Sequence, residues 1–183
     1  MVPSSPRLNV KEQLVSKRFT FPAIITLVLL ASASAKAAES CANPGTPSAN
    51  IELVKKFYSA INSHAKPLLD EVLAKDWVEV PLTPGQGPGL EGMKGALDHY
   101  YAAFPDFTAT NEDFVANADK VLVRSTIHAT QKGDFAGIKA TGKTITLMAM
   151  DLHQICNGRV IQTWHVEDWL SAMFEMGALP PKN

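Results

Sequence analysis

The sequence is poor in cysteine and has no excess of charge of either sign. Its 183 residues include only two cysteines, which excludes a disulfide-dense scaffold and a multi-cysteine zinc or iron–sulfur site. Because 17 lysine and arginine residues are balanced by 18 aspartate and glutamate residues, the chain lacks the positive charge with which nucleic-acid-binding proteins neutralise phosphates. With 46% hydrophobic residues, the chain can build a core, so disorder is excluded and one domain is expected.

Several signature motifs of cofactor and nucleophile chemistry are also missing. The chain contains no Gly-x-Gly-x-x-Gly, no Walker-type phosphate loop, no Gly-x-Ser-x-Gly and no His-Glu-x-x-His. No internal repeat is visible either. The sequence therefore gives no motif for a nucleotide, for a zinc protease or for a serine hydrolase.

The first 38 residues have the pattern of a secretory signal peptide. Four basic residues lie within residues 1–18, residues 19–31 are uncharged and mostly apolar, and the small residues at 31–38 offer three overlapping Ala-x-Ala cleavage sites. The alternative is an uncleaved membrane anchor, but a bilayer span needs about 20 apolar residues. We therefore expect residues 1–38 to be a signal peptide and cleavage region. The mature protein would be periplasmic or secreted, with no stable membrane insertion after cleavage.

Cleavage changes the charge of the chain but keeps both cysteines. Removing residues 1–35 takes away four basic residues and Glu12, a net loss of three positive charges that takes the formal charge from −1 to −4. Cys41 and Cys156 stay in the mature chain and would meet an oxidising compartment, where they could pair. The disulfide stays open at this point, because sequence does not give the separation of the two Cα atoms.

Hydrophobic spacing divides the mature chain into helices followed by strands. Residues 39–48 are expected to be a flexible lead-in, residues 49–178 the domain and residues 179–183 a C-terminal tail. Helical spacing predicts helices from residue 48, from residue 66 and over 90–104, with a short strand at 77–81. A period of two then predicts strands at 107–117, 120–131, 143–156 and 159–167, before a helix at 168–176. This order predicts an α+β fold with an antiparallel meander.

The dipeptide Asn157-Gly158 is the strongest short hairpin signal in the chain. With a two-residue turn and unbroken pairing, His153 lies opposite Gln162 and Asp151 opposite Trp164, while His165 points to the other face. One face would then carry two acids, a histidine and an amide among apolar side chains: Asp151, His153, Ile155, Val160, Gln162, Trp164, Val166 and Asp168.

This face has the ingredients for proton transfer. A carboxyl group beside a tryptophan and a valine loses hydration, which raises its pKa towards the range useful for acid/base chemistry. A histidine on the same face could donate a hydrogen bond to a developing enolate. The alternative, which the pattern alone favours, is that the face is exposed and its polar side chains are ordinary surface residues.

From Ile51 to Gly177 the chain resembles the SnoaL-like polyketide cyclases (ester cyclases) of the nuclear-transport-factor-two-like superfamily. The matching segments are 53–62 (LVKKFYSAIN), 87–94 (GPGLEGMK), 104–106 (FPD), 133–143 (GDFAGIKATGK), 151–161 (DLHQICNGRVI), 164–168 (WHVED) and 176–177 (MG). The resemblance implies a cone-shaped α+β barrel, in which a curved antiparallel sheet is wrapped by helices around a deep apolar pocket. It also implies a cofactor-free intramolecular aldol ring closure and a homodimer formed through the open face of the sheet.

The resemblance implies roles for particular residues. The family's acid/base is an aspartate of the last strand, which falls on Asp168 here, and a histidine of the neighbouring strand matches His153. Pocket residues of the first helix match Tyr58 and Asn62.

The other candidate site residues lie on the same predicted face as Asp168. Trp164 would shield it from water, and Asp151 and Gln162 would contact the substrate. Many members have a histidine before the Gly/Pro loop, but this stretch is Glu79-Val80-Pro81 here.

Two functions follow from these observations. The first is an exported, cofactor-independent enzyme that acts on a small hydrophobic carbonyl compound by aldol cyclisation, isomerisation or hydration/dehydration. Asp168 would take a proton next to the carbonyl, and His153 would hold the enolate oxygen. The alternative is a non-catalytic module that binds a hydrophobic ligand, because a fold does not define a function.

Three further hypotheses concern single features. A metal site built from Asp151, His153, His165 and His128 is disfavoured, because His165 points away from His153 in the predicted register. Cys156 is disfavoured as a nucleophile because it lies on the face opposite to His153. The glycine-rich segment 131–143 either covers the mouth of the pocket or is an ordinary long hairpin connection.

Overall fold

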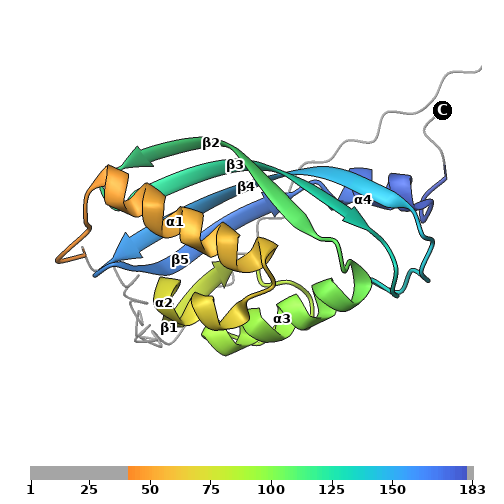
Figure 1. The fold of residues 1–183 in the computed structure, drawn as a ribbon, viewed down its shortest axis with the longest axis horizontal. Helices are drawn as coiled ribbons and strands as arrows, with labels where there is room; N and C mark the ends of the chain where they lie inside the picture. Colours follow the sequence, from red (N-terminus) through yellow and green to blue (C-terminus); the bar gives the residue numbers. More distant parts are fainter. Residues whose placement is uncertain (1–40, 181–183) are drawn as a thin grey trace, which may run out of the picture. The chain divides into compact units, whose positions relative to one another are not determined.

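The computed structural model describes residues 41–180, so the predicted signal peptide and the last residues of the tail lie outside the described residues. Helical segments come before and after the first strand (Figure 1): α1 is Pro47–Asn62, η1 is the 3-10 turn Lys66–Leu68 and α2 is Leu69–Val72, all before β1, and α3 is Gly89–Ala103, between β1 and β2. The strands are β1 Leu73–Val80, β2 Thr108–Asn117, β3 Lys120–Thr130, β4 Thr144–Cys156 and β5 Arg159–Glu167, and α4 is Trp169–Met176.

The strands form one curved sheet in the order β1-β5-β4-β3-β2 (Figure 1). Strands β2 to β5 make the predicted antiparallel meander, whereas β1 pairs parallel with β5. The turn between β4 and β5 is Asn157-Gly158, with φ angles of 51° and 70°, which are the left-handed values that this dipeptide favours in tight hairpins. The predicted hairpin is therefore confirmed.

Helix α1 begins where its sequence offers both a proline and a cap. Pro47 occupies the first turn, where its missing N–H costs nothing, and the hydroxyl of Thr46 accepts a hydrogen bond from the Ala49 N–H over 3.3 Å. Val54, Phe57, Tyr58 and Ile61 form the buried face of this helix. This face turns Tyr58 towards the inner side of the sheet.

Residues 41–46, expected to be a flexible lead-in, are bonded to the β4–β5 hairpin and linked through Asn50 to the β2–β3 turn. Cys41 and Cys156 form a disulfide, with their Cα atoms 5.6 Å apart. Nearby, the Asn157 N–H donates to the Asn43 carbonyl over 2.9 Å. Asn50, which is buried, donates to the carbonyls of Pro44 and Ala118. Within residues 41–180, no helix is both long and apolar enough to cross a membrane.

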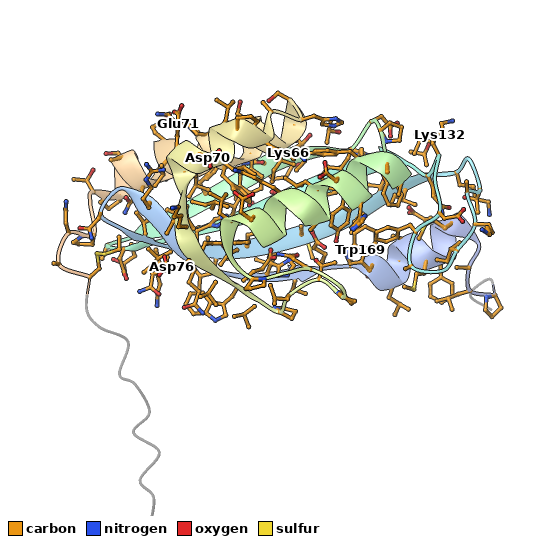
Figure 2. The ribbon with its side chains drawn as sticks, turned by 90° about the horizontal axis from the view of Figure 1, so that it is seen from below. Lys66, Asp70, Glu71, Asp76, Lys132 and Trp169 are labelled. Atoms are coloured by element: carbon orange, nitrogen blue, oxygen red, sulfur yellow. A yellow bond between two sulfur atoms is a disulfide. The ribbon has the colours of Figure 1, made fainter. Side chains whose placement is uncertain are left out.

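The segment 131–143 packs against the aromatic end of α3. Gln131 is fully buried, and its side chain donates to the Ile138 carbonyl and accepts from the Thr141 hydroxyl, so the segment is held from within. Phe135 of this segment and Trp169 at the start of α4, labelled in Figure 2, have ring centroids 4.9 Å apart, and both rings lie beside α3. No residue of 131–143 lines the cavity described below.

Candidate active site

A cavity lies between the inner face of the sheet and helices α1 and α3. It is a narrow cavity of about 70 Å³ that opens partly to solvent. Most of its lining is apolar or aromatic: Phe57, Ile61, Met93, Ala96, Leu97, Tyr100, Phe107, Ala109, Ile127 and Ala149. A wall of this composition favours a hydrophobic ligand.

Four ionisable side chains face this cavity from three neighbouring strands. Asp151 comes from β4, Glu79 from β1, and His165 and Glu167 from β5. Asp151 and His165 are direct cross-strand partners, so their side chains lie side by side on the inner face. Because ionisable groups are costly to place in an apolar cavity, their concentration at one place indicates a functional site.

Asp151 is the carboxyl group best suited to exchange a proton. Burial raises the pKa of Asp151 to about 6, and the hydrogen bond from Tyr58 opposes this rise. Tyr58 Oη donates to Asp151 Oδ2 over 2.7 Å. Burial, followed by the charge of Asp151, raises the pKa of Tyr58 well above its ordinary value, so Tyr58 keeps its proton and remains the donor. A carboxyl group with a pKa near 6 can accept and return a proton close to neutral pH.

Glu79 and His165 form a second polar pair in the cavity. His165 Nε2 donates to the Pro81 carbonyl oxygen over 2.7 Å and lies 3.9 Å from Glu79 Oε1. Burial raises the pKa of Glu79, while a hydrogen bond from Gln86 Nε2 acts in the opposite direction. The Val80–Pro81 peptide bond that precedes the loop is cis.

The Gly/Pro loop at 82–88 closes one side of the cavity. Thr83 and Gln86 line the cavity, and the Thr83 hydroxyl lies 3.4 Å from the hydroxyl of Tyr100. The loop also lies directly against α3, because a Cβ atom at Gly92 would be only 1.8 Å from the Gly87 carbonyl oxygen. Glycine is therefore required at position 92 for this close approach.

The fold and the cavity agree with one protein family. The family model of the SnoaL-like polyketide cyclases matches residues 52–175, well over half of the chain. The chain belongs to this family. A search of curated proteins gives no significant match.

Solved structures share the fold of this SnoaL-like domain. TsrD from Streptomyces laurentii is 27% identical, with a TM-score of 0.69 over 74% of this chain and 99% of its own. IdmH from Streptomyces antibioticus, a putative polyketide cyclase, is 29% identical, with a TM-score of 0.63 over 70% of this chain and 98% of its own. AclR from Streptomyces galilaeus, a putative hydroxylase, is 21% identical, covers 74% and 100%, and with a TM-score of 0.64 shows the fold alone. The predicted family and the α+β cone fold are confirmed.

The pairing of β4 with β5 differs from the prediction after its first two pairs. Beyond the turn, Gln154 lies opposite Gln162, so Ile161 is an extra residue on β5. This residue is a β-bulge, and it shifts every later pair by one position. A shift of one residue exchanges the two faces of a strand. As a result His165 and Glu167 face the cavity of the SnoaL-like domain, which corrects the predicted orientation of His165.

The same shift moves three predicted site residues out of the cavity. Trp164 and Gln162 belong to the outer face of the sheet, where the Lys120 ammonium lies 5.7 Å from the Trp164 ring centroid. Asp168 is exposed and caps α4, where its carboxylate accepts hydrogen bonds from the Ser171 N–H at 3.1 Å and the Ser171 hydroxyl at 2.6 Å. Asp168 therefore does not line the cavity, whereas Asp151 does.

His153 lies behind the cavity wall and does not line it. Its side chain is fully buried, with Nε2 at 3.3 Å from Tyr58 Oη and Nδ1 at 2.9 Å from Thr163 Oγ1. Both ring nitrogens therefore have partners within the protein, and His153 is not among the residues that would meet a substrate in this cavity. Burial also lowers the pKa of His153 to about 3, so the ring is neutral at ordinary pH.

Of the predicted first-helix residues, Tyr58 lines the cavity and Asn62 does not. The Asn62 amide donates to the Ala109 carbonyl at 2.9 Å and accepts from the Ala109 N–H at 2.8 Å. These two bonds join the end of α1 to β2, so Asn62 has a structural task. Among the predicted substrate-binding residues, Tyr58 and Asp151 are the two that the structure brings together.

Four polar residues that the strands contribute to the cavity were not predicted as site residues from the sequence. His165 and Glu167 were assigned to the wrong face because of the bulge, and no residue type in the sequence marks the extra position in β5. Glu79 could have been predicted, because it lies in the stretch where the family resemblance places a pocket histidine. Ser125 belongs to the ordinary alternating pattern of β3, yet its hydroxyl is buried, lines the cavity and makes no hydrogen bond of good geometry within residues 41–180.

The described part of the chain holds no group of three or more histidine, cysteine or acidic side chains arranged to bind a metal ion. His128, one of the residues considered for such a site, is exposed and pairs with the Thr146 hydroxyl at 3.0 Å. Cys156 is held in the disulfide.

Proposed function

We propose that this SnoaL-like domain is a cofactor-independent acid/base enzyme that acts on a small hydrophobic carbonyl compound. The observation that carries the proposal is Asp151, a half-buried carboxyl group with a pKa of about 6 at the polar part of an apolar cavity. The reaction would be an aldol cyclisation, an isomerisation or a hydration/dehydration. The description of IdmH as a putative polyketide cyclase supports the first of these.

The proposed reaction begins with the ionised form of Asp151. Its carboxylate takes a proton from the carbon next to the substrate carbonyl, and the negative charge that develops on the carbonyl oxygen needs a hydrogen-bond donor. The Ser125 hydroxyl lines the same cavity and is the candidate for this donor. After bond formation, protonated Asp151 returns its proton to the product. The apolar wall excludes water, which would otherwise compete for the charged groups.

We expect kcat/KM for this reaction to fall as pH decreases below about 6. The base must be ionised, and the pKa of Asp151 is about 6, so the rate should drop close to tenfold per pH unit on the acid side. His153 cannot cause this limb, because its pKa is about 3. The measurement is a pH–rate profile with β-keto esters and aliphatic or aromatic ketones as substrates.

The same panel distinguishes an enzyme from a binding module. If the ligands bind, as followed by tryptophan fluorescence or calorimetry, and none is converted at any pH between 5 and 9, the domain is a carrier or sensor of hydrophobic molecules and the enzyme proposal is wrong. A profile that stays flat between pH 5 and 8 would exclude Asp151 as the base while leaving the enzyme class intact.

We also propose that the domain forms a homodimer through the outer face of its sheet. This face carries exposed apolar side chains from three adjacent strands: Val78, Val80, Met148, Met150 and Val166. Such a patch is unusual on a monomer surface and fits a second copy of the same face.

We expect the Met150→Lys/Val166→Lys double variant to be monomeric in sedimentation velocity. Leu68→Lys, at an equally exposed apolar residue of η1, is the control and should leave the dimer intact. A wild-type protein that sediments as a monomer would contradict this proposal.

We further propose that the domain acts outside the cytosol, after removal of residues 1–38. The disulfide between Cys41 and Cys156 supports this location, because structural disulfides persist in oxidising compartments and are rare in the cytosol.

A further inference from the structure

A continuous row of hydrogen-bonded side chains runs behind the cavity and ends at Asp151. Trp77 Nε1 lies 3.0 Å from Thr163 Oγ1, and this oxygen lies 2.9 Å from His153 Nδ1. On its other side, His153 Nε2 lies 3.3 Å from Tyr58 Oη, which lies 2.7 Å from Asp151 Oδ2. The first three side chains are at most 2% exposed, so water does not compete for their polar atoms.

The two ends of this row fix the direction of its hydrogen bonds. An indole N–H can only donate, so Thr163 Oγ1 accepts from Trp77. A carboxylate can only accept, so Tyr58 uses its single hydroxyl hydrogen for Asp151. The Tyr58 oxygen can then only accept from His153, which requires the hydrogen of the imidazole to be on Nε2.

The remaining link follows from the charge state of His153. Because its ring is neutral, it carries one hydrogen, and with that hydrogen on Nε2 the Nδ1 atom is an acceptor. The Thr163 hydroxyl, which already accepts from Trp77, supplies the matching donor. Every polar atom in the row then has a hydrogen-bond partner, whereas reversing any one link leaves a buried group without its partner.

We propose that Trp77, Thr163 and His153 are positioning residues that hold Tyr58 as the permanent donor to Asp151 Oδ2. With Oδ2 occupied, Oδ1 is the oxygen that takes the substrate proton. Asp151 Oδ1 makes no hydrogen bond within the described part of the chain, and Asp151 lines the cavity, which agrees with this assignment. The catalytic meaning of the row rests on the function proposed above for Asp151, but its direction does not.

The direction can be measured without any substrate. In the wild-type protein labelled with ¹⁵N-histidine, we expect the His153 signals of a neutral ring with the hydrogen on Nε2 and an unprotonated Nδ1. A ring with its hydrogen on Nδ1 would overturn the proposal. This outcome is independent of whether the protein turns over any ketone, so failure of the enzyme proposal and failure of the positioning proposal are distinguishable.

Thr163 offers a matched pair of variants for the second measurement. Thr163→Val keeps the shape of the side chain but removes its hydroxyl, so His153 Nδ1 loses its partner and the ring is held less firmly against Tyr58. The Tyr58 hydroxyl is then oriented less strictly, and Asp151 would lose part of a hydrogen bond that lowers its pKa. We expect the pKa of Asp151 to rise by about one unit, a tenfold change in acid strength. Thr163→Ser keeps the hydroxyl and should restore the wild-type value.

The titration must be followed on Asp151 itself, because other ionisable groups face the same cavity. These are Glu79 of β1, His165 and Glu167 of β5, Tyr58 of α1 and Tyr100 of α3, besides His153 behind the wall. ¹³C NMR of the Asp151 carboxyl carbon separates its pKa from theirs. If Thr163→Val loses stability but leaves the pKa of Asp151 unchanged, Thr163 has a merely structural role and the proposal is wrong. If the variant does not fold, the ¹⁵N measurement of the His153 tautomer in the wild-type protein is the test of the proposal.

Discussion

Replacing Asp151 with asparagine should lower kcat/KM by a factor of about 10²–10⁴, the usual contribution of a general base. Asparagine has nearly the same shape, and its amide oxygen can still accept the hydrogen bond from Tyr58, so packing should be preserved. What the Asp151→Asn variant loses is the ability to take a proton. Steady-state kinetics with the best substrate of the panel, together with circular dichroism as a check on folding, would measure the effect.

Asp168→Asn is the matched control for this experiment. The substitution is chemically identical, and asparagine is as good a helix N-cap as aspartate, so α4 should keep its start. Because Asp168 lies outside the cavity, its variant should retain wild-type kcat/KM. The opposite pattern, with activity lost in Asp168→Asn and kept in Asp151→Asn, would show that the catalytic group is Asp168 after all.

The same pair of variants separates catalysis from stability. Because the pKa of Asp151 is raised on folding, the native state binds its proton more tightly than the unfolded chain does. This group therefore makes the free energy of unfolding fall as pH rises from about 4 to 6. Asp151→Asn should lack this contribution and be at least as stable as the wild type above pH 6, as urea unfolding at several pH values would show. Loss of activity without loss of stability is the signature of a functional rather than a structural residue.

Removing the disulfide should have the largest effect on stability. The Cys41→Ser/Cys156→Ser double variant loses a crosslink between residues 115 positions apart, which restricts the unfolded chain strongly. We expect the free energy of unfolding to fall by about 2–5 kcal/mol and Tm by about 5–15 °C. Differential scanning calorimetry would measure both changes.

A reducing agent provides the control for the disulfide experiment. It should lower the Tm of the wild type to that of the double variant and leave the Tm of the double variant unchanged. Neither cysteine lines the cavity, so kcat/KM at 25 °C should be unaffected by either treatment. Equal melting temperatures for the oxidised wild type and the double variant would contradict the expected stabilisation.

The sequence predicts the elements of this fold well, because their signals are local. Apolar spacing places α1, α3 and the four meander strands close to their observed bounds, and the Asn157-Gly158 turn is placed correctly. Strand β1 is longer than predicted and pairs parallel with β5, a long-range contact that spacing alone does not indicate.

The candidate site is predicted less well, because its geometry depends on one irregular residue. The bulge at Ile161 decides whether Trp164 or His165 of β5 faces the pocket, and neither hydrophobicity nor turn chemistry marks it. The roles of His153 and Asn62 depend on partners that are distant along the chain or hidden by the same shift, namely Ala109 and Thr163. The sequence motifs therefore predict which residues lie near the cavity, but they do not predict which of these side chains face it.

The bulge in β5 also bears on how this family can diversify. Deleting Ile161 would rotate the second half of β5 by one position, so that Trp164 and Val166 would point inwards and His165 and Glu167 outwards. A single codon loss would thus exchange an acid- and imidazole-lined wall for an aromatic and aliphatic one, with every neighbouring strand left in place. Evolution can therefore alter the chemistry of such a pocket through the length of one strand, without substituting any residue that lines it.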